Sequence, residues 1–258
     1  MRWVACRHAA TLAVVTMTAG CAWLPRAATV PMPSLELTTR ANGSDPLVVF
    51  LPGRFDRPDR FRDERFAEVL ARRLPEATAV AADAHLGYYL DGSVVERLHE
   101  DVVRPLRSRT GSRVHLVGIS MGGLGALVYA QAHPEDVARV VVLAPYLGED
   151  EVIGEIMAAG GLATWRPPRQ SDPDDFQRDI WTWLKGYAEP NADRPPLVVG
   201  WGSDDDLAPA SQLLAEVLPP DVVFTAPGGH DWPTWRSLWS RIVDSGMLDP
   251  GPVTEEGK

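Results

Sequence analysis

The sequence has few cysteines, no excess of basic residues and no long apolar run. Only Cys6 and Cys21 occur among 258 residues, which excludes a fold held together by several disulfides. The 25 basic residues are outnumbered by 35 acidic ones, and the net charge of -10 opposes any partner that binds through phosphate groups. We therefore expect no nucleic-acid ligand. Cysteines and histidines do not cluster at metal-ligand spacing, so no metal and no cofactor is predicted.

The composition is that of an ordinary globular protein. Hydrophobic residues make up 45% of the chain and charged residues 23%, which excludes disorder, a coiled coil and a collagen-like fibre. The length suits a single α/β domain with a sizeable core.

The first twenty residues have the features of a signal peptide. Arg2 and Arg7 precede an apolar stretch over residues 9–19, which is too short to span a bilayer but suits the core of a signal peptide. The TAGC sequence at residues 18–21 resembles the lipobox of bacterial lipoproteins. This resemblance implies cleavage before Cys21, lipid attachment to it, and an exported, membrane-anchored protein on the periplasmic or cell-surface side. The alternative is that Cys21 merely lies near an ordinary cleavage site.

The remaining chain divides into a linker, a domain and a tail. Residues 21–45 are predicted to hold a lipid-anchored tether and the first strand region, because residues 22–33 are rich in alanine and proline. The domain is predicted over residues 46–248, and a flexible tail over residues 249–258.

Within the domain, β-branched runs alternate with amphipathic runs, which predicts a mostly parallel sheet flanked by helices. The predicted strands are residues 46–51, 77–82, 113–118, 137–144, 197–201 and 222–225. The predicted helices are residues 61–74, 94–107, 122–133, 210–218 and 235–245, with Pro105 placed in a fraying last turn. Residues 148–196 break this alternation and carry several aromatic residues among prolines and acids. A segment of this length predicts a helical lid insertion, although a helical layer that only packs on the core is the alternative.

Gly118-Ile-Ser-Met-Gly122 is the most informative motif. It is a G-x-S-x-G sequence between a predicted strand and a predicted helix, where a nucleophilic serine sits on a sharp, strained turn. The motif predicts that Ser120 is a nucleophile. A serine needs a base for this role, and His230 follows two glycines after the last predicted strand. We assign it the base role, with His85 as the alternative.

An acidic residue is needed to orient the histidine, and it is expected between serine and histidine in chain order. The strand at residues 197–201 is followed by Gly202-Ser-Asp-Asp-Asp206. The spacing from Gly202 favours Asp205, with Asp204 and Asp206 as alternatives. The other interpretation is that these three aspartates only form a solvent-exposed acidic turn.

With these motifs in this order, the chain resembles the α/β hydrolases over about residues 47–245. The resemblance rests on LPGR at residues 51–54, GISMG at the serine, GSDDDLAP at residues 202–209 and GGHDW at residues 228–232. It implies an α/β-hydrolase fold and an oxyanion hole formed by the backbone amides of Met121 and Arg54. Phe55 is the alternative loop donor.

These inferences predict a serine hydrolase that cleaves small-molecule carboxylic esters through an acyl-enzyme. Acyl transfer, thioesterase or peptidase activity with the same triad is an alternative, and so is a non-catalytic ligand-binding lipoprotein. Phe55, Trp165 and Trp181 are predicted to contact substrate, the two tryptophans because the insertion's aromatic residues favour an apolar acyl pocket.

Overall fold

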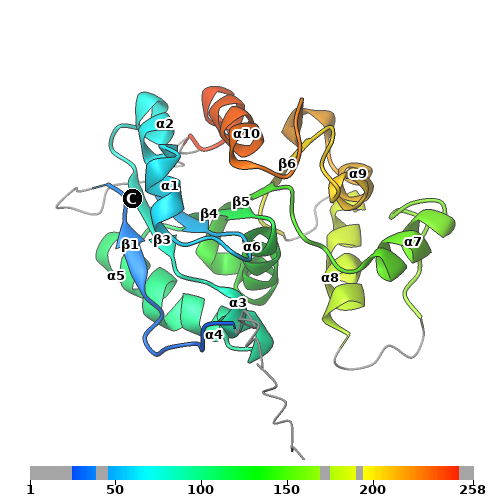
Figure 1. Cartoon of the computed structure of the whole chain (residues 1–258), viewed down its shortest axis with the longest axis horizontal. Helices are drawn as coiled ribbons and strands as arrows, with labels where there is room; N and C mark the ends of the chain where they lie inside the picture. The colour runs from blue at the N-terminus through cyan, green and yellow to red at the C-terminus, as the bar shows by residue number, and fades with distance from the viewer. Residues whose placement is uncertain (1–24, 39–45, 169–174, 190–193, 250–258) are drawn as a thin grey trace, which may run out of the picture.

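A seven-stranded sheet forms the centre of the molecule in the computed structural model, which describes residues 25–38, 46–168, 175–189 and 194–249 (Figure 1). The strand order is β1-β3-β2-β4-β5-β6-β7, and all neighbours pair in parallel except β1, which is antiparallel to β3. The strands are β1 (Ser34–Glu36), β2 (Leu47–Leu51), β3 (Thr78–Ala82), β4 (Val114–Ile119), β5 (Val137–Leu143), β6 (Leu197–Gly202) and β7 (Val223–Ala226). Because β2 to β7 are parallel, their carboxyl ends meet at one edge of the sheet.

Helices cover both faces of the sheet. On one face lie α1 (Asp59–Asp63), α2 (Phe66–Arg73) and α10 (Trp232–Asp244); on the other lie α4 (Val94–Leu98), α5 (Arg104–Thr110) and α6 (Met121–Ala132) (Figure 1). The short α3 (Leu86–Leu90) follows β3, and α9 (Ala208–Ala215) follows β6. Helix α6 packs on β2, β4 and β5, and α10 packs on β5, β6 and β7. This arrangement confirms the predicted fold class.

The central strands are buried on both faces, which explains their runs of valine and leucine. Every residue of β2, β4 and β6 is buried, as expected where helices cover both sides of a parallel sheet. Under α2 and α10, Phe50 packs edge-on against Trp239 and Phe66 stacks on the same indole, with ring centroids 5.5 and 5.6 Å apart. The Trp239 indole N–H donates to the Phe66 carbonyl at 3.0 Å, so the polar atom of this aromatic core is satisfied.

The helix predicted at residues 94–107 is longer than expected. It runs continuously through α4, a π-helical segment (His99–Val103) and α5 to Thr110, and it ends at Gly111, which has a φ of 74°. The prediction that Pro105 lies in a fraying last turn is therefore wrong. Proline lacks an N–H and its ring crowds the carbonyl four residues earlier, and the wider π turn directly before it accommodates both effects.

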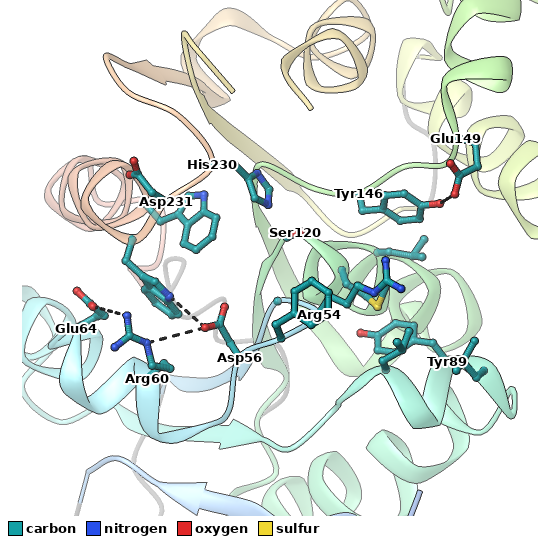
Figure 2. Close-up of a pocket in the computed structure, with 18 of the residues that line it drawn as sticks. Arg54, Asp56, Arg60, Glu64, Tyr89, Ser120, Tyr146, Glu149, His230 and Asp231 are labelled. Carbon is teal, nitrogen blue, oxygen red and sulfur yellow. Dashed lines mark hydrogen bonds and ion pairs between the residues drawn. The ribbon is translucent and has the colours of Figure 1, made fainter. Parts of the chain in front are cut away.

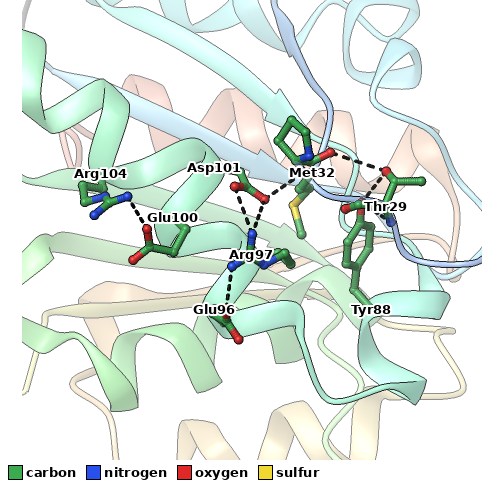
Figure 3. Close-up of polar contacts among 9 residues, drawn as sticks. Thr29, Met32, Tyr88, Glu96, Arg97, Glu100, Asp101 and Arg104 are labelled. Carbon is green, nitrogen blue, oxygen red and sulfur yellow. Dashed lines mark hydrogen bonds and ion pairs between the residues drawn. The ribbon is translucent and has the colours of Figure 1, made fainter.

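Residues 25–33, predicted to be part of a tether, instead form a strap along the domain. The Arg26 guanidinium donates to both oxygens of Asp83 at 2.7 and 2.8 Å. Figure 3 shows the next contacts of the strap, in which Thr29 bonds to the Tyr88 hydroxyl and the Met32 amide donates to Asp101 at 2.7 Å. Its alanines and prolines suit an extended chain, but polar partners on the domain fix that chain in place.

The predictions for the two ends of the chain fall largely outside the described residues. The signal peptide over residues 1–20, lipid attachment at Cys21 and the tail after Asp249 stay predictions. Asp249 itself bonds to Arg73 at 2.7 and 2.5 Å. None of the described helices combines the length and the apolar character needed to cross a membrane.

The segment between β5 and β6 is helical, as predicted. It contains α7 (Asp150–Ala158), α8 (Phe176–Lys185) and a 3-10 turn (Gly186–Ala188), which lie beside α9 at one end of the sheet (Figure 1). Helix α7 packs on α9 and α8 packs on α6, and the Leu162 amide donates to Glu216 at 2.9 Å. The described part of the insertion is therefore packed on the domain, and its role as a lid stays a prediction.

The strap generates a stability prediction. Replacing Arg26 with alanine leaves the Asp83 carboxylate, whose side chain is only 12% exposed, without its guanidinium partner. We expect Arg26→Ala to lower the free energy of unfolding by about 1 to 3 kcal/mol, measured by urea unfolding. The control is Arg57→Ala, because Arg57 and Asp59 are 3.7 Å apart and mostly exposed; its effect should stay within about 0.5 kcal/mol. Equal effects of the two changes would show that the Arg26 pair does not hold the strap.

Candidate active site

Ser120 lies on a strained turn between β4 and α6. Its backbone has a φ of 52° and a ψ of -116°, a conformation that residues other than glycine rarely adopt. Surrounding hydrogen bonds hold it there: the Ser120 amide donates to the Leu143 carbonyl at 2.9 Å, and its carbonyl accepts from the Tyr146 amide at 3.0 Å. The turn therefore presents the hydroxyl at the carboxyl edge of the sheet, as the G-x-S-x-G motif predicted.

The glycines of the motif are required by close backbone contacts. A Cβ on Gly118 would lie 2.1 Å from the Gly122 carbonyl oxygen, and a Cβ on Gly122 would lie 2.2 Å from the Leu51 carbonyl oxygen. Both distances are far inside van der Waals contact. Strand β2, strand β4 and the first turn of α6 can approach each other this closely only without side chains at these two positions.

Asp205 and His230 are brought together from separate loops. Asp205 follows β6 and its side chain is fully buried, while His230 lies between β7 and α10. The Nδ1 atom of His230 lies 2.9 and 3.0 Å from the two carboxylate oxygens of Asp205. Asp205 also accepts from the Leu207 amide at 2.8 Å, and the Trp235 ring meets the imidazole edge-on at 5.0 Å. These contacts hold the imidazole in place through Nδ1 and the ring itself, and they do not involve Nε2.

Backbone contacts join the acidic loop to the histidine loop. The Asp204 amide donates to the Gly228 carbonyl at 2.9 Å, and the Ser203 amide donates to the Ala226 carbonyl at 2.8 Å. A Cβ on Gly202 would lie 2.2 Å from the Gly228 oxygen. Of the three adjacent aspartates, only Asp205 is buried, whereas Asp204 and Asp206 are exposed.

Ser120 and His230 line one cavity of about 860 Å³ (Figure 2). In the described part of the chain, no hydrogen bond joins the Ser120 hydroxyl to the imidazole. In unliganded active sites, catalytic hydrogen bonds are often long and shorten only when substrate binds. The other lining residues are Gly53, Arg54, Phe55, Asp56, Arg60, Glu64, Leu86, Tyr89, Leu90, Met121, Leu124, Tyr146, Glu149, Phe176, Asp231, Trp232, Pro233 and Trp235.

The two residues expected to supply oxyanion-hole amides, Arg54 and Met121, both border the cavity beside Ser120. Met121 is the first residue of α6, so its amide has no partner within the helix. Within the described ranges, the structure shows no hydrogen-bond acceptor for the Arg54 amide either. Phe55 is 68% exposed at the cavity rim, and the Arg54 guanidinium lies 5.1 Å from the centre of its ring.

Trp165 and Trp181, predicted to contact substrate, do not line the cavity. Both are almost completely buried in the insertion, and structural partners satisfy their indole N–H groups. Trp165 donates to Glu155 at 2.7 Å, and Trp181 donates to the Leu147 carbonyl at 2.8 Å. The tryptophans pack the insertion against the domain, because large aromatic side chains are more often core residues than ligand contacts.

Several cavity residues were missed by the sequence reasoning. Asp56 follows the LPGR sequence after β2, and Trp232 ends the GGHDW motif, so both lie within two residues of assigned positions. Tyr146 follows the end of β5, and Tyr89 lies on α3 after β3. The available signal was their position after parallel strands, because the carboxyl ends of those strands meet at the site.

A histidine cluster lies outside the cavity. One ligand atom each from His99, His133 and Asp136 lies within 4.8 Å of the others. Arg107 and the Tyr129 hydroxyl already bond to the Asp136 carboxylate. The two imidazole rings are stacked with an angle of 12° between their planes, so their in-plane lone pairs cannot converge on one ion. Asp136 is instead the buried acceptor of a hydrogen-bond network in which Tyr129 also bonds to His99 at 3.0 Å.

A mostly parallel sheet with a serine on a strained strand-to-helix turn and an aspartate–histidine pair at the same edge defines the class of α/β hydrolases. A sequence model of the family described as "Putative esterase" matches residues 88–244. That match covers more than half of the chain, so the protein belongs to this esterase family and is a hydrolase. No curated protein sequence matches the chain.

Solved structures of hydrolases share this fold. A ferulic acid esterase is 20% identical with a TM-score of 0.54, over 79% of this chain and 85% of that one. The S-formylglutathione hydrolase FrmB from Staphylococcus aureus is 15% identical with a TM-score of 0.52, over 77% and 79%. A CIB-like hydrolase from Thermoplasma acidophilum is 16% identical with a TM-score of 0.53, over 82% and 89%. At these identities the likeness shows the fold alone.

The close contact at Gly122 generates a second prediction. Gly122→Ala places a methyl group against the Leu51 carbonyl, and the backbone of β2 can move away only at a cost in free energy. We therefore expect the change to lower the free energy of unfolding by about 2 kcal/mol or more and to reduce activity. The control is Gly154→Ala in α7, where a Cβ would meet no atom within 4 Å. That change should raise stability by about 0.5 to 1 kcal/mol. Urea unfolding followed by tryptophan fluorescence measures both, and a Gly122→Ala protein as stable as wild type would contradict the steric argument.

Proposed function

We propose that the protein is a serine hydrolase that cleaves small-molecule carboxylic esters, with Ser120 as nucleophile, His230 as general base and Asp205 as the residue that orients it. The main support is that His230, which is bonded to the buried Asp205, lines the same cavity as a serine held in a strained turn. Membership of an esterase family supports the reaction class.

The proposed reaction begins when His230 Nε2 takes the proton of the Ser120 hydroxyl as its oxygen attacks the ester carbonyl. The carbonyl electrons move to the oxygen, and the amides of Met121 and Arg54 stabilise the resulting oxyanion. When this intermediate collapses, the bond to the alcohol breaks and His230 returns the proton to the departing oxygen. Water, deprotonated by His230, then attacks the acyl carbonyl; when the bond to Ser120 breaks, His230 returns the proton to the serine oxygen and the acid is released. Asp205 holds the imidazole with its proton on Nδ1 and stabilises the imidazolium.

The nucleophile assignment predicts that a short-chain aryl ester gives a burst of alcohol followed by steady turnover. We expect Ser120→Ala to remove the burst and to lower kcat/KM by at least about a thousandfold, and to abolish labelling by a fluorophosphonate probe. Ser108→Ala is the control, because Ser108 is an exposed serine on α5 and does not line the cavity. Wild-type turnover in Ser120→Ala would rule out this mechanism. Added alcohols, thiols or amines distinguish hydrolysis from acyl transfer through the products formed.

The role of Asp205 predicts a separate effect on kcat. An asparagine there can still bond to the imidazole but favours the unproductive tautomer, so we expect Asp205→Asn to lower kcat by about a thousandfold or more. Asp206→Asn, a change of the same kind at an exposed neighbour, should leave kcat within about twofold. Steady-state kinetics of both variants test this assignment, and equal losses would assign the role to the acidic turn as a whole.

A further inference from the structure

Asp56 lies beside the nucleophile although the proposed mechanism does not use it. It belongs to the loop after β2 that also carries Arg54, and it lines the cavity. A Cβ on Gly53 would lie 3.1 Å from Asp56 Oδ2 and 3.7 Å from Ser120 Cβ. The carboxyl group and the serine therefore flank the same glycine.

Within the described ranges, only one oxygen of this carboxyl group has a structural partner. Asp56 Oδ1 accepts from the Trp232 indole at 3.2 Å and lies 3.9 Å from the Arg60 guanidinium. Among the described residues, none forms a hydrogen bond with the side-chain oxygen Oδ2. Figure 2 shows this second oxygen turned away from Arg60, toward the space below His230.

Charged groups lie on both sides of the cavity. Asp56, Arg60 and Glu64 lie on one side of Ser120, and Arg54 and Glu149 lie on the other side together with Tyr89 and Tyr146 (Figure 2). Arg60 bonds to Glu64 at 2.9 Å, so its charge is already shared between two carboxylates. In total, four carboxylates and two guanidinium groups line the cavity. An anionic group near Asp56 would be repelled, whereas a hydrogen-bond donor there would find an acceptor.

The Asp56 carboxyl group as a whole is also partly desolvated. Burial raises the pKa of Asp56 above its usual value, and the bond from Trp232 only partly offsets this effect. A pKa raised by desolvation indicates that the carboxylate has lost hydration and that hydrogen-bond donors of the protein have not fully replaced it. A donor on a bound molecule would replace that hydration.

We propose that Asp56 determines substrate specificity, with Oδ2 accepting a hydrogen bond from a hydroxyl or ammonium group on the alcohol portion of the ester. The alcohol portion is assigned because His230 must protonate the departing oxygen, and Asp56 Oδ2 points toward the space below His230 (Figure 2). This inference rests on the proposed function.

The test compares three butyrate esters: propyl and 2-hydroxyethyl, which are of similar size, and the larger 2-(dimethylamino)ethyl, which is protonated at neutral pH. A hydrogen bond to a charged group is typically worth a factor of about ten or more, so wild-type kcat/KM should favour at least one donor-bearing ester over propyl by that factor. Asp56→Ala should remove the preference. Asp56→Asn keeps an oxygen for Trp232 but turns an amide N–H₂ to the substrate, so it should remove an ammonium preference and retain part of a hydroxyl preference. Asp59→Asn, an exposed carboxylate of the same segment, should leave all ratios unchanged.

A binding measurement separates this inference from the proposed function. In Ser120→Ala protein, titration calorimetry should show tighter binding of the preferred donor-bearing ester than of propyl butyrate, and Ser120→Ala/Asp56→Ala protein should not distinguish them. Binding preference without wild-type turnover would overturn the proposed function and support the role of Asp56. Turnover with the same ester ratios in wild type and in Asp56→Asn and Asp56→Ala would overturn the role of Asp56 alone. Equal binding and turnover of all three esters by wild type would also overturn it.

Discussion

The site depends on the close approach of three backbone segments around Ser120. The end of β2, the end of β4 and the first turn of α6 meet at distances that allow no Cβ at Gly118 or Gly122. Ser120 has a positive φ at this contact, and its amide and carbonyl bonds to Leu143 and Tyr146 at the β5 end hold the residue there. A strained residue persists only when its surroundings fix it in this way. The serine is therefore presented by packing that is complete before any substrate binds.

The parallel sheet supplies the second condition, which is the convergence of loops that are distant in sequence. Asp205 follows β6 and His230 follows β7, and these strands are neighbours in the sheet. The loops are then joined by backbone hydrogen bonds at Gly228 and Ala226. The Asp205 side chain is fully buried against them, so the imidazole is fixed by the sheet order and by local contacts together.

The sequence predicted the features that depend on short local motifs, and it did not predict the features that depend on packing between distant segments. The strained turn needs glycines around Ser120, the acidic turn needs Gly202, and the histidine loop needs Gly228, so each of these positions leaves a recognisable local pattern. Trp165 and Trp181 carry no such pattern, because a tryptophan that packs an insertion and one that binds an acyl chain have the same composition signal. The docked strap was missed for a related reason: its partners Asp83, Tyr88 and Asp101 are far away in sequence.

Locally unfavourable features gather at the cavity and favourable packing lies behind it. Besides the strained Ser120 and the desolvated Asp56, the Tyr89 hydroxyl is buried without a hydrogen-bond partner in the described chain, and burial raises its pKa. An unsatisfied buried hydroxyl costs about 1 to 3 kcal/mol, and backbone strain at a non-glycine residue costs a similar amount. Phe50, Phe66 and Trp239 form a buried aromatic cluster. Burial of each ring stabilises the fold by a free energy of similar size to these costs. Such an arrangement is expected when polar groups are kept in place for a ligand, since an apolar side chain at Tyr89 or Asp56 would have removed the cost.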